Sequence, residues 1–246
     1  MTTQISAFER NTFDNQVIVI TGAASGLGKA AAQLIAARGA TVICLDLNPD
    51  GLAACCSNIQ SISGVCDSYQ LDVSDQSAVF KVIADIQSKH KRIDALINCA
   101  GYPGPTTEFV EDIKWPDYEK VMAVNLRGAF HVGAALLAVL RRKPREFSSV
   151  YIASTAGLVG ESGGSVYCAS KFGLIGFTQS FAGEIAEFGG RANAVCPGNV
   201  DSPMLKVLAT SIGARSGKSG DATLEEWKSA SGFKRLIKPE EVAQTC

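Results

Sequence analysis

The sequence carries almost no net charge, because 23 lysine and arginine residues stand against 24 aspartate and glutamate residues in a chain of 246. Neither sign gathers in one region, so the chain lacks the field that attracts nucleic acid or an anionic membrane. No apolar run reaches about 18 residues, and no basic segment followed by an apolar one opens the chain, which argues against a membrane span or secretion. We therefore expect a soluble cytoplasmic protein that acts on a small molecule.

The sequence is also poor in the spacings that bind metals. It has only two histidines, and Cys55 and Cys56 are adjacent, whereas the cysteine pairs of zinc sites are separated by about two residues. The eight cysteines are Cys44, Cys55, Cys56, Cys66, Cys99, Cys168, Cys196 and Cys246. They are scattered through apolar runs, which favours reduced core thiols over a disulfide framework. We expect no metal.

Short β-branched runs alternate with longer amphipathic stretches along the chain. The runs predict buried strands at residues 17–21, 40–45, 68–73, 93–98, 148–153 and 191–196. Helical patterns fill the gaps, and such alternation is typical of a parallel sheet joined by right-handed crossovers. We therefore predict an α/β fold, a single-domain doubly wound parallel sheet of the Rossmann type with helices on both faces.

The chain has no internal repeat and no linker that would mark a second domain. Residues 1–12 are polar and aperiodic, so we expect a loose N-terminal arm before one dinucleotide-binding and catalytic domain at residues 13–246. Between residues 203 and 232 the pattern breaks into glycine, serine and lysine. This segment predicts a mobile loop or short helices, and we expect it to contact the substrate.

A glycine-rich turn follows the first predicted strand and precedes a helical run. Glycines at positions 22, 26 and 28 let the backbone turn tightly and approach a pyrophosphate, whose charge the helix N-terminus stabilises. Asp46 ends the second predicted strand, where its carboxylate can accept hydrogen bonds from an adenosine ribose. The same carboxylate repels a 2'-phosphate, which favours NAD over NADP. A turn role for Asp46 and tolerance of NADP through Arg38 stay open.

Tyr167 and Lys171 are four residues apart, so on a helix their side chains project from one face. The pKa of an isolated tyrosine is about 10, but a cation about 4 Å away favours the phenolate by about 4 kcal/mol at an effective dielectric constant of about 20. The spacing therefore indicates a proton-transfer pair. An isolated pair of this kind is commonly a surface contact, so the interpretation depends on the rest of the chain.

Together with further motifs, the glycine turn and the Tyr167–Lys171 pair follow the order and spacing of the short-chain dehydrogenase/reductase family, which the chain resembles from about residue 13 onward. The further motifs are Asp72 after the third strand, Asn98-Cys99-Ala100-Gly101 after the fourth, Asn125 in a helix, Ser154 thirteen residues before Tyr167, and Pro197-Gly198 after the sixth strand. Cys99 departs from the family pattern, which has a second asparagine there.

The resemblance implies a catalytic set of Ser154, Tyr167, Lys171 and Asn125. Ser154 is expected to hydrogen-bond the reacting oxygen, and Tyr167 to exchange a proton with it. Lys171 is expected to lower the tyrosine pKa and to bond the nicotinamide ribose, while Asn125 holds a water beside it. The cofactor-binding residues implied are Gly22, Ser25, Gly26, Leu27, Gly28, Asp46, Leu47, Asp72, Val73, Asn98, Ala100, Gly101, Tyr167, Lys171, Pro197, Gly198 and Val200.

These expectations describe an NAD(P)-dependent oxidoreductase that interconverts a secondary alcohol and a ketone by hydride transfer. The substrate-facing segments at residues 102–105, 160–164 and beyond Pro203 carry little charge apart from Glu161, which favours a neutral small molecule. The resemblance also implies a homodimer or homotetramer that pairs the helices of Asn125 and Tyr167.

Three alternatives remain. The first is a catalytically weak NAD-binding regulatory protein, and the second is an epimerase or dehydratase that keeps its NAD bound. Family members usually continue into a seventh strand, which we expect to be missing here, so that the sixth strand forms an exposed edge. A truncated, inactive family member is the third alternative.

Overall fold

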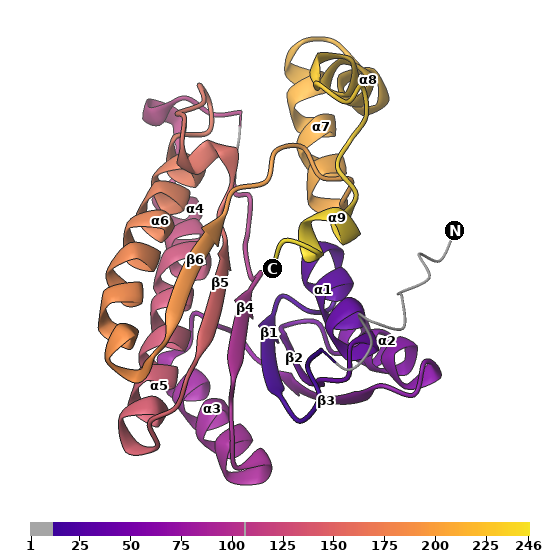
Figure 1. The fold of residues 1–246 in the computed structure, drawn as a ribbon. Helices are drawn as coiled ribbons and strands as arrows, with labels where there is room; N and C mark the ends of the chain where they lie inside the picture. Colours follow the sequence, from indigo (N-terminus) through magenta and orange to yellow (C-terminus); the bar gives the residue numbers. More distant parts are fainter. Residues whose placement is uncertain (1–11, 106) are drawn as a thin grey trace.

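The fold is built on one parallel β-sheet. The computed structural model describes residues 12–105 and 107–246, so the expected N-terminal arm lies, apart from Thr12, outside the described residues. The strands are β1 (Val17–Thr21), β2 (Thr41–Asp46), β3 (Val65–Gln70), β4 (Ala95–Asn98), β5 (Ser148–Ile152) and β6 (Arg191–Val195). They lie in the order β3-β2-β1-β4-β5-β6, and every neighbouring pair is parallel (Figure 1). The predicted α/β class and the sixth strand as an edge are confirmed.

The third strand differs most from its prediction. It spans Val65–Gln70 rather than residues 68–73, and it is largely exposed because it forms the outer edge of the sheet. The buried residues Leu71 and Val73, which suggested a strand, follow it and pack into the core beneath the helices. The predicted bounds of the other strands agree with the structure to within two residues.

One face of the sheet is covered by the helices that follow β3, β4 and β5. These are α3 (Gln76–His90), α4 (Trp115–Met122), α5 (Gly128–Arg142) and α6 (Ser165–Ile185), with a π-helical turn at Ala123–Arg127 joining α4 to α5. Their apolar sides meet the strands in the larger core cluster, to which Ile83, Leu136 and Phe181 contribute. Short 3-10 turns lie at Val110–Asp112, Thr155–Gly157 and Ala186–Phe188.

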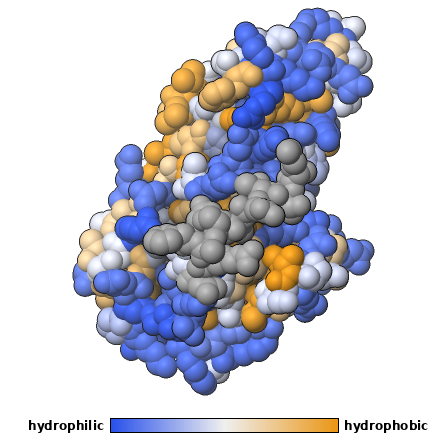
Figure 2. Space-filling view, turned by 45° about the vertical axis from the view of Figure 1, so that its right-hand side comes forward, coloured by the Kyte–Doolittle hydropathy of each residue, from blue (hydrophilic) through white to orange (hydrophobic). Residues whose placement is uncertain are grey.

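The other face is covered by α1 (Gly26–Ala37), α2 (Pro49–Ser61) and α9 (Pro239–Ala243). This layer packs on the sheet mainly through small residues, including Ala31, Ala32 and Cys55. Outside the grey atoms, the face of the molecule in Figure 2 is mostly hydrophilic, with smaller apolar areas. The helices on both faces therefore bury the sheet as the prediction requires.

The segment that follows β6 folds into helices. Helices α7 (Pro203–Arg215) and α8 (Gly220–Ala230) form a pair that projects beyond the sheet (Figure 1). Each begins with a serine N-cap, because Ser202 accepts a hydrogen bond from the Leu205 N–H and Ser219 accepts one from the Ala222 N–H. Of the two predictions for this segment, short helices therefore match the structure.

The continuous helix Trp115–Arg142 is, among the described residues, the one helix with the length and apolar composition of a membrane span. Half of its most apolar stretch is buried inside the protein. Val132, Leu136 and Leu140 of this helix belong to the core cluster against the sheet. Its apolar composition is therefore that of a core helix.

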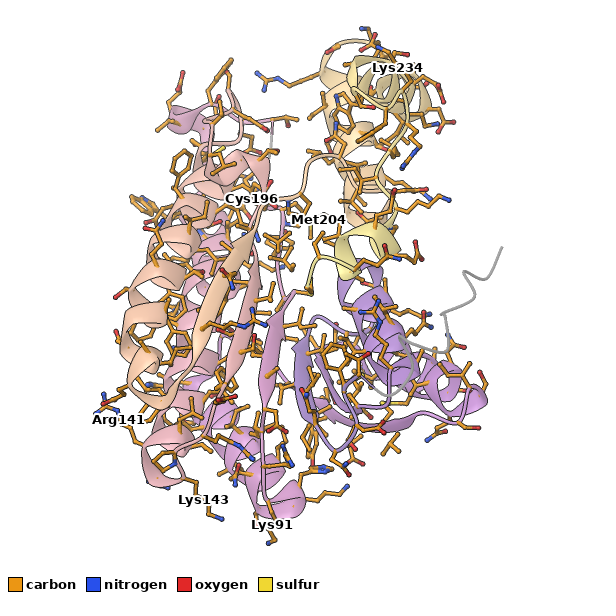
Figure 3. The ribbon with its side chains drawn as sticks, viewed as in Figure 1. Lys91, Arg141, Lys143, Cys196, Met204 and Lys234 are labelled. Atoms are coloured by element: carbon orange, nitrogen blue, oxygen red, sulfur yellow. A yellow bond between two sulfur atoms is a disulfide. The ribbon has the colours of Figure 1, made fainter. Side chains whose placement is uncertain are left out.

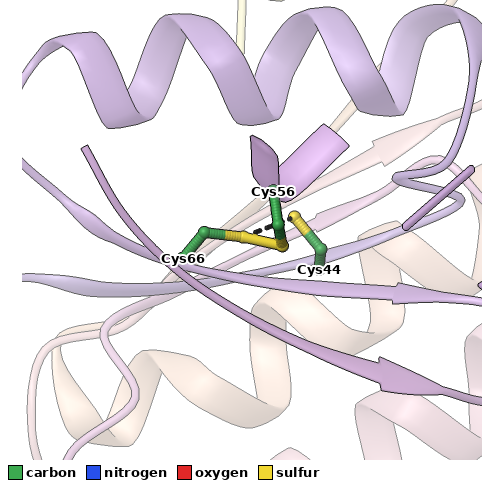
Figure 4. Close-up of side chains that lie close together, drawn as sticks. All are labelled: Cys44, Cys56 and Cys66. Atoms are coloured by element: carbon green, nitrogen blue, oxygen red, sulfur yellow. Dashed lines mark hydrogen bonds between the residues drawn. A yellow bond between two sulfur atoms is a disulfide. The ribbon is translucent and has the colours of Figure 1, made fainter. Parts of the chain in front are cut away.

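Two cysteines are paired, contrary to the expectation that all thiols are reduced. Cys56 of α2 and Cys66 of β3 form a disulfide, with their Cα atoms 5.6 Å apart (Figure 4). The prediction was wrong for this pair because helix α2 turns back over the strand that follows it, which cysteine spacing alone does not reveal. The remaining six cysteines are free thiols.

We predict that Tyr151→Phe stabilises the protein. Tyr151 is fully buried in β5 and makes edge-on contacts with the rings of Phe177 and Phe181, and within the described chain its hydroxyl has no hydrogen-bond partner. Removing an unsatisfied buried hydroxyl should raise the free energy of unfolding by about 1 kcal/mol, measured by urea denaturation. Tyr151→Leu, which also removes the ring contacts, should destabilise. A Phe variant less stable than the wild type would contradict the prediction.

Candidate active site

The carboxyl ends of all six strands meet at one edge of the sheet, and two adjoining cavities open there. Cys196 at the end of β6 and Met204 at the start of α7 lie at this edge, whereas Lys91, Arg141 and Lys143 lie at the opposite one (Figure 3). Strand order reverses between β1 and β4, which is where open parallel sheets bind ligands.

The first cavity, of about 400 Å³, lies over the ends of the strands on the β1 side of this reversal. Eleven of the residues expected to bind the cofactor line it: Gly22, Ser25, Gly26, Leu27, Gly28, Asp46, Leu47, Asp72, Val73, Ala100 and Gly101. They come from the loops after β1, β2, β3 and β4. The fold thus brings together residues up to 79 positions apart, as the hydrogen bond between Thr21 and the Ala100 N–H illustrates.

The glycine turn leaves space for a phosphate group. Gly22 has a positive φ of 67°, a conformation that favours glycine. A Cβ atom on Gly28 would lie 2.1 Å from the Gly22 carbonyl oxygen, so the helix can start this close to the turn only with glycine there. Within the described chain, the side chain of the N-cap residue Ser25 makes no capping hydrogen bond. The first N–H groups of α1 therefore remain suited to a pyrophosphate.

Asp46 holds the backbone on two sides of the cavity. Its Oδ2 accepts a hydrogen bond of 3.0 Å from the Ala24 N–H in the glycine turn, and its Oδ1 accepts one of 3.0 Å from the Asn48 N–H. A carboxylate has about four acceptor positions, so both oxygens keep room for ribose hydroxyls. The turn role and the ribose role of Asp46 are thus compatible. Arg38 is absent from the described lining of the cavity.

Asn98 lies behind the cavity rather than in its lining. It is 1% exposed, and its Oδ1 accepts a hydrogen bond of 3.0 Å from the Thr21 hydroxyl. That hydroxyl in turn accepts one of 3.1 Å from the Ala100 N–H. Asn98 therefore fixes the ends of β1 and β4 relative to each other. Thr21, which the sequence analysis did not single out, completes this link.

The second cavity, of about 210 Å³, adjoins the first and holds the expected catalytic residues. Ser154, Tyr167, Lys171, Pro197, Gly198 and Val200 line it, and Leu27 and Gly101 line both cavities. Ser154 follows β5, while Tyr167 and Lys171 project from successive turns of α6. The three side chains thus converge beside the cavity that carries the glycine turn.

The three polar side chains are fixed by neighbouring backbone. Ser154 accepts a hydrogen bond of 3.1 Å from the Ala156 N–H and is hydrogen-bonded to Tyr167. The Lys171 Nζ donates to the Ile152 carbonyl oxygen at 2.8 Å and lies 5.6 Å from the centre of the Tyr167 ring. The lysine is 4% exposed, so its charge is held in a largely water-free position.

Burial dominates the proton affinities of this site. It raises the pKa of Tyr167 to about 12, although the hydrogen bond with Ser154 acts in the opposite direction. It also lowers the pKa of Lys171 to about 8. Lys171 is not among the groups that shift the Tyr167 pKa, so the expected lowering by this lysine is not found; its ammonium is directed to the Ile152 carbonyl instead.

Asn125 lies in the π-helical turn and supports the site from behind. Its side chain accepts a hydrogen bond of 2.7 Å from the Tyr102 N–H and donates to the Tyr102 carbonyl and the Ser170 hydroxyl, each at 3.0 Å. It is fully buried and does not line either cavity. Asn125 therefore fixes the loop after β4 against helix α6, which carries Lys171.

Several lining residues were not identified from the sequence. Cys99, Ser202 and Met204 line both cavities. Cys99 occupies the position at which the chain departs from the family motif, and that departure was the available signal. Ser202 and Met204 adjoin Pro203, where the substrate segment was predicted to begin, but only folding of α7 over the strand ends shows that they reach the cofactor side.

The outer wall of the second cavity is largely apolar. It is formed by Pro103 and by the α7 residues Met204, Leu205, Leu208 and Ile212. Glu161 is the one acidic residue of its described lining, and its charge contributes to the raised pKa of Tyr167. The cavity can therefore accept an apolar molecule with few charged groups beside Ser154 and Tyr167.

Comparison with known proteins gives concordant matches. A family profile described as short chain dehydrogenase matches residues 16–212. A 3-oxoacyl-[acyl-carrier-protein] reductase of Thermotoga maritima is 36% identical over 231 residues, which cover 94% of this chain and 88% of the relative. A 2-dehydro-3-deoxy-L-rhamnonate dehydrogenase (NAD(+)) of a Sphingomonas species is 38% identical over 196 residues, covering 78% of this chain and 75% of the relative.

Among solved structures, levodione reductase superposes with a TM-score of 0.89 at 29% identity, covering 95% of this chain and 89% of that chain. The cavities described above thus belong to a fold that is shared with proteins of similar length.

We predict that Lys171→Met changes stability in a pH-dependent way. The folded protein lowers the pKa of Lys171 from 10.5 to about 8, so the unfolded chain holds an extra proton between these values. The lysine therefore lowers stability fully below about pH 8, and this cost, about 3 kcal/mol, disappears as the pH rises towards 10.5. The stability of the variant relative to the wild type should fall accordingly between pH 7 and pH 10 in urea denaturation. A pH-independent difference would contradict the shift.

Proposed function

The chain belongs to the short-chain dehydrogenase/reductase family of NAD(P)-dependent oxidoreductases, and we propose that it interconverts a secondary alcohol and a ketone on a neutral small molecule. The observation that carries this proposal is the convergence of Ser154, Tyr167 and Lys171 on a cavity that adjoins the glycine-turn cavity. A redox cofactor and a carbonyl compound can thus lie next to each other over the strand ends.

The proposed chemistry divides between the cofactor and the chain. The nicotinamide cofactor, when bound, supplies the two-electron redox chemistry. Ser154 holds the reacting oxygen by a hydrogen bond, and Tyr167 donates its proton to that oxygen in reduction or accepts a proton from it in oxidation. The raised pKa of Tyr167 keeps the phenol protonated at neutral pH, the form that reduction requires.

Lys171 has a positioning and electrostatic role in this proposal. Its ammonium is anchored to the Ile152 carbonyl at 2.8 Å, and Asn125 buttresses the same helix through Ser170. With its pKa near 8, the lysine is charged through neutral pH and stabilises negative charge that develops on Tyr167 as its proton leaves.

The substrate is proposed to be neutral and largely apolar away from its carbonyl. Leu205, Leu208 and Ile212 supply apolar surface on one side of the second cavity, and Glu161 disfavours an anionic group near Tyr167. Steroid-like, polyketide-derived and partly hydroxylated ketones all meet this description. A relative named 3beta-hydroxysteroid dehydrogenase is consistent with the first class.

The proposed cofactor is NAD rather than NADP. Asp46 lines the first cavity at the end of β2, where its carboxylate favours two ribose hydroxyls and repels a 2'-phosphate. The solved relatives include an NAD+-bound xylitol dehydrogenase and a polyketide ketoreductase with NADPH, so the family accepts both cofactors. Asp46 is the feature of this chain that favours the first.

We also propose a cytoplasmic homodimer or homotetramer. Phe130 of α5 is 56% exposed and Phe172 of α6 is 46% exposed, on the two helices that resemble the family's subunit contacts. Covering such rings with a second copy would remove apolar surface from water.

Tyr167→Phe tests the catalytic proposal. The variant keeps the ring but has no exchangeable proton, so turnover on a panel of neutral ketones with NADH should fall by at least about 100-fold. NADH binding, measured by fluorescence titration, should change little because the phenol does not hold the adenosine end. Tyr151→Phe serves as the matched control and should retain activity. A Tyr167→Phe enzyme with most of its activity would refute the assignment.

Asp46→Ser tests the choice of cofactor. Loss of the carboxylate should weaken NADH binding by at least about tenfold and weaken NADPH binding less, because the repulsion of the 2'-phosphate is also removed. The ratio of the two dissociation constants is the informative quantity. A change that merely loosens the glycine turn would weaken both cofactors equally, and that result would count against a selective role.

A further inference from the structure

A cluster of cysteine side chains lies outside both cavities, on the α2 side of the sheet. The Cys56–Cys66 disulfide joins α2 to β3, and the Cys66 sulfur lies 3.6 Å from the Cys44 sulfur of β2 (Figure 4). Cys55, on the helix beside Cys56, is hydrogen-bonded to Cys44. Cys44 and Cys55 are buried, whereas Cys56 and Cys66 are partly exposed. The two disulfide-forming residues are thus the members of the cluster that solvent can reach.

The cluster is connected to the adenosine end of the proposed cofactor site through a short series of contacts. Cys44 is two residues before Asp46 in β2. Helix α2 begins with the N-cap Asn48, whose N–H donates to Asp46. A Cβ atom on Gly51 would lie only 2.6 Å from the Cβ of Ala24, so the first turn of α2 packs directly on the glycine turn. Asp46 therefore connects α2, which carries Cys56, to the backbone that lines the first cavity.

We propose that Cys56 and Cys66 form a site of reversible thiol oxidation, and that the oxidation state of this pair sets the affinity of the adjoining cofactor site. The effect on the cofactor rests on the proposed function, whereas the oxidation itself does not. A persistent disulfide is unusual in the cytoplasmic setting proposed above, where such bonds serve mainly as redox signals. The edge position of β3 leaves the pair open to small thiols and disulfides.

The oxidant is a small-molecule disulfide, and the reaction balances without other reagents. A thiolate of Cys66 attacks one sulfur of that disulfide, which releases one small thiolate and forms a mixed disulfide. The Cys56 thiolate then attacks the Cys66 sulfur, forms the Cys56–Cys66 bond and releases the second small thiolate. Two protein thiols are oxidised as one small disulfide is reduced to two thiols, which carry the two protons. Excess small dithiol reverses the sequence.

Cys44 does not take part in this thiol–disulfide exchange. Its hydrogen bond with Cys55 and its burial raise the pKa of its thiol, so it stays protonated although its sulfur lies near Cys66. The three sulfur atoms of Cys44, Cys56 and Cys66 lie within 4.8 Å of one another, which also suits one soft metal ion. A metal-thiolate site and the disulfide require the same two cysteines, so the experiment has to separate them.

The oxidised form is expected to bind the cofactor more tightly. The disulfide ties α2 to β3 across a sequence separation of 10 residues and so restricts the helix that packs on the glycine turn. Reduction removes this tether, and the adenosine end must then lose more conformational freedom on binding. We expect the dissociation constant of NADH to rise by about threefold to tenfold on reduction, and the unfolding temperature to fall by about 5 °C.

The experiment uses the full chain equilibrated with oxidised or reduced glutathione. Thiol titration should give six free thiols after oxidation, as in the structure, and eight after reduction. Cys56→Ser and Cys66→Ser should each bind NADH with the affinity of the reduced form and show no response to glutathione. Cys55→Ser is the matched control, because it alters the neighbouring residue of the same helix, and it should keep the full response.

Three results would overturn the proposal. Eight titratable thiols in both glutathione states would show that the pair does not oxidise. Equal NADH affinity with six and with eight free thiols would show that the oxidation state of the pair does not affect cofactor binding. One equivalent of zinc retained by the reduced chain, and lost in Cys44→Ser as well as in Cys56→Ser, would identify a metal site. If NADH binds in neither state, the proposed function fails, while the thiol count and unfolding temperature still decide the disulfide.

Discussion

The parallel arrangement of all six strands is the constraint on which the rest of the structure depends. It sends every strand end to one edge, so loops from distant parts of the sequence meet there. The hydrogen bonds from Thr21 to Asn98 and from Ala100 to Thr21 fix the two central strands where their crossovers diverge. Without that alignment the glycine turn and the Tyr167 helix would not face adjoining cavities.

Burying Tyr167 and Lys171, the proposed catalytic pair, has a cost in free energy. Burial shifts Tyr167 and Lys171 in opposite directions, and both shifts favour the neutral form of the side chain. A protein built for stability alone would not keep a lysine that is 4% exposed at this position. The proposed function gives a reason for the buried lysine, which the Ile152 carbonyl holds beside Tyr167, where negative charge would develop.

The sequence predicted elements well where hydrophobic pattern and position agree, and less well where contacts are non-local. The strand of Val17–Thr21 is buried on both sides, so its apolar run matched its bounds. Edge strand β3 is largely exposed and has no buried residue, and the buried residues beyond its end shifted the predicted bounds of the strand. Motif spacing located Ser154, Tyr167 and Lys171, but the supporting roles of Asn98 and Asn125 depend on partners 77 and 23 residues away. The spacing of the cysteines likewise did not predict the Cys56–Cys66 disulfide, because the pairing depends on how α2 packs on β3.

Asp46 links the proposed cofactor choice to the proposed redox site. Its carboxylate is the acceptor for both the glycine turn and the start of α2, so any displacement of that helix acts on the group that would hold the ribose. The disulfide restrains α2 about two turns further along, at Cys56. Gly51 packs closely on Ala24, where a side chain on the glycine would clash, so movement of the helix is passed directly to the turn. In the proposal, a change in one sulfur–sulfur bond therefore acts on cofactor affinity through Asp46 and the glycine turn.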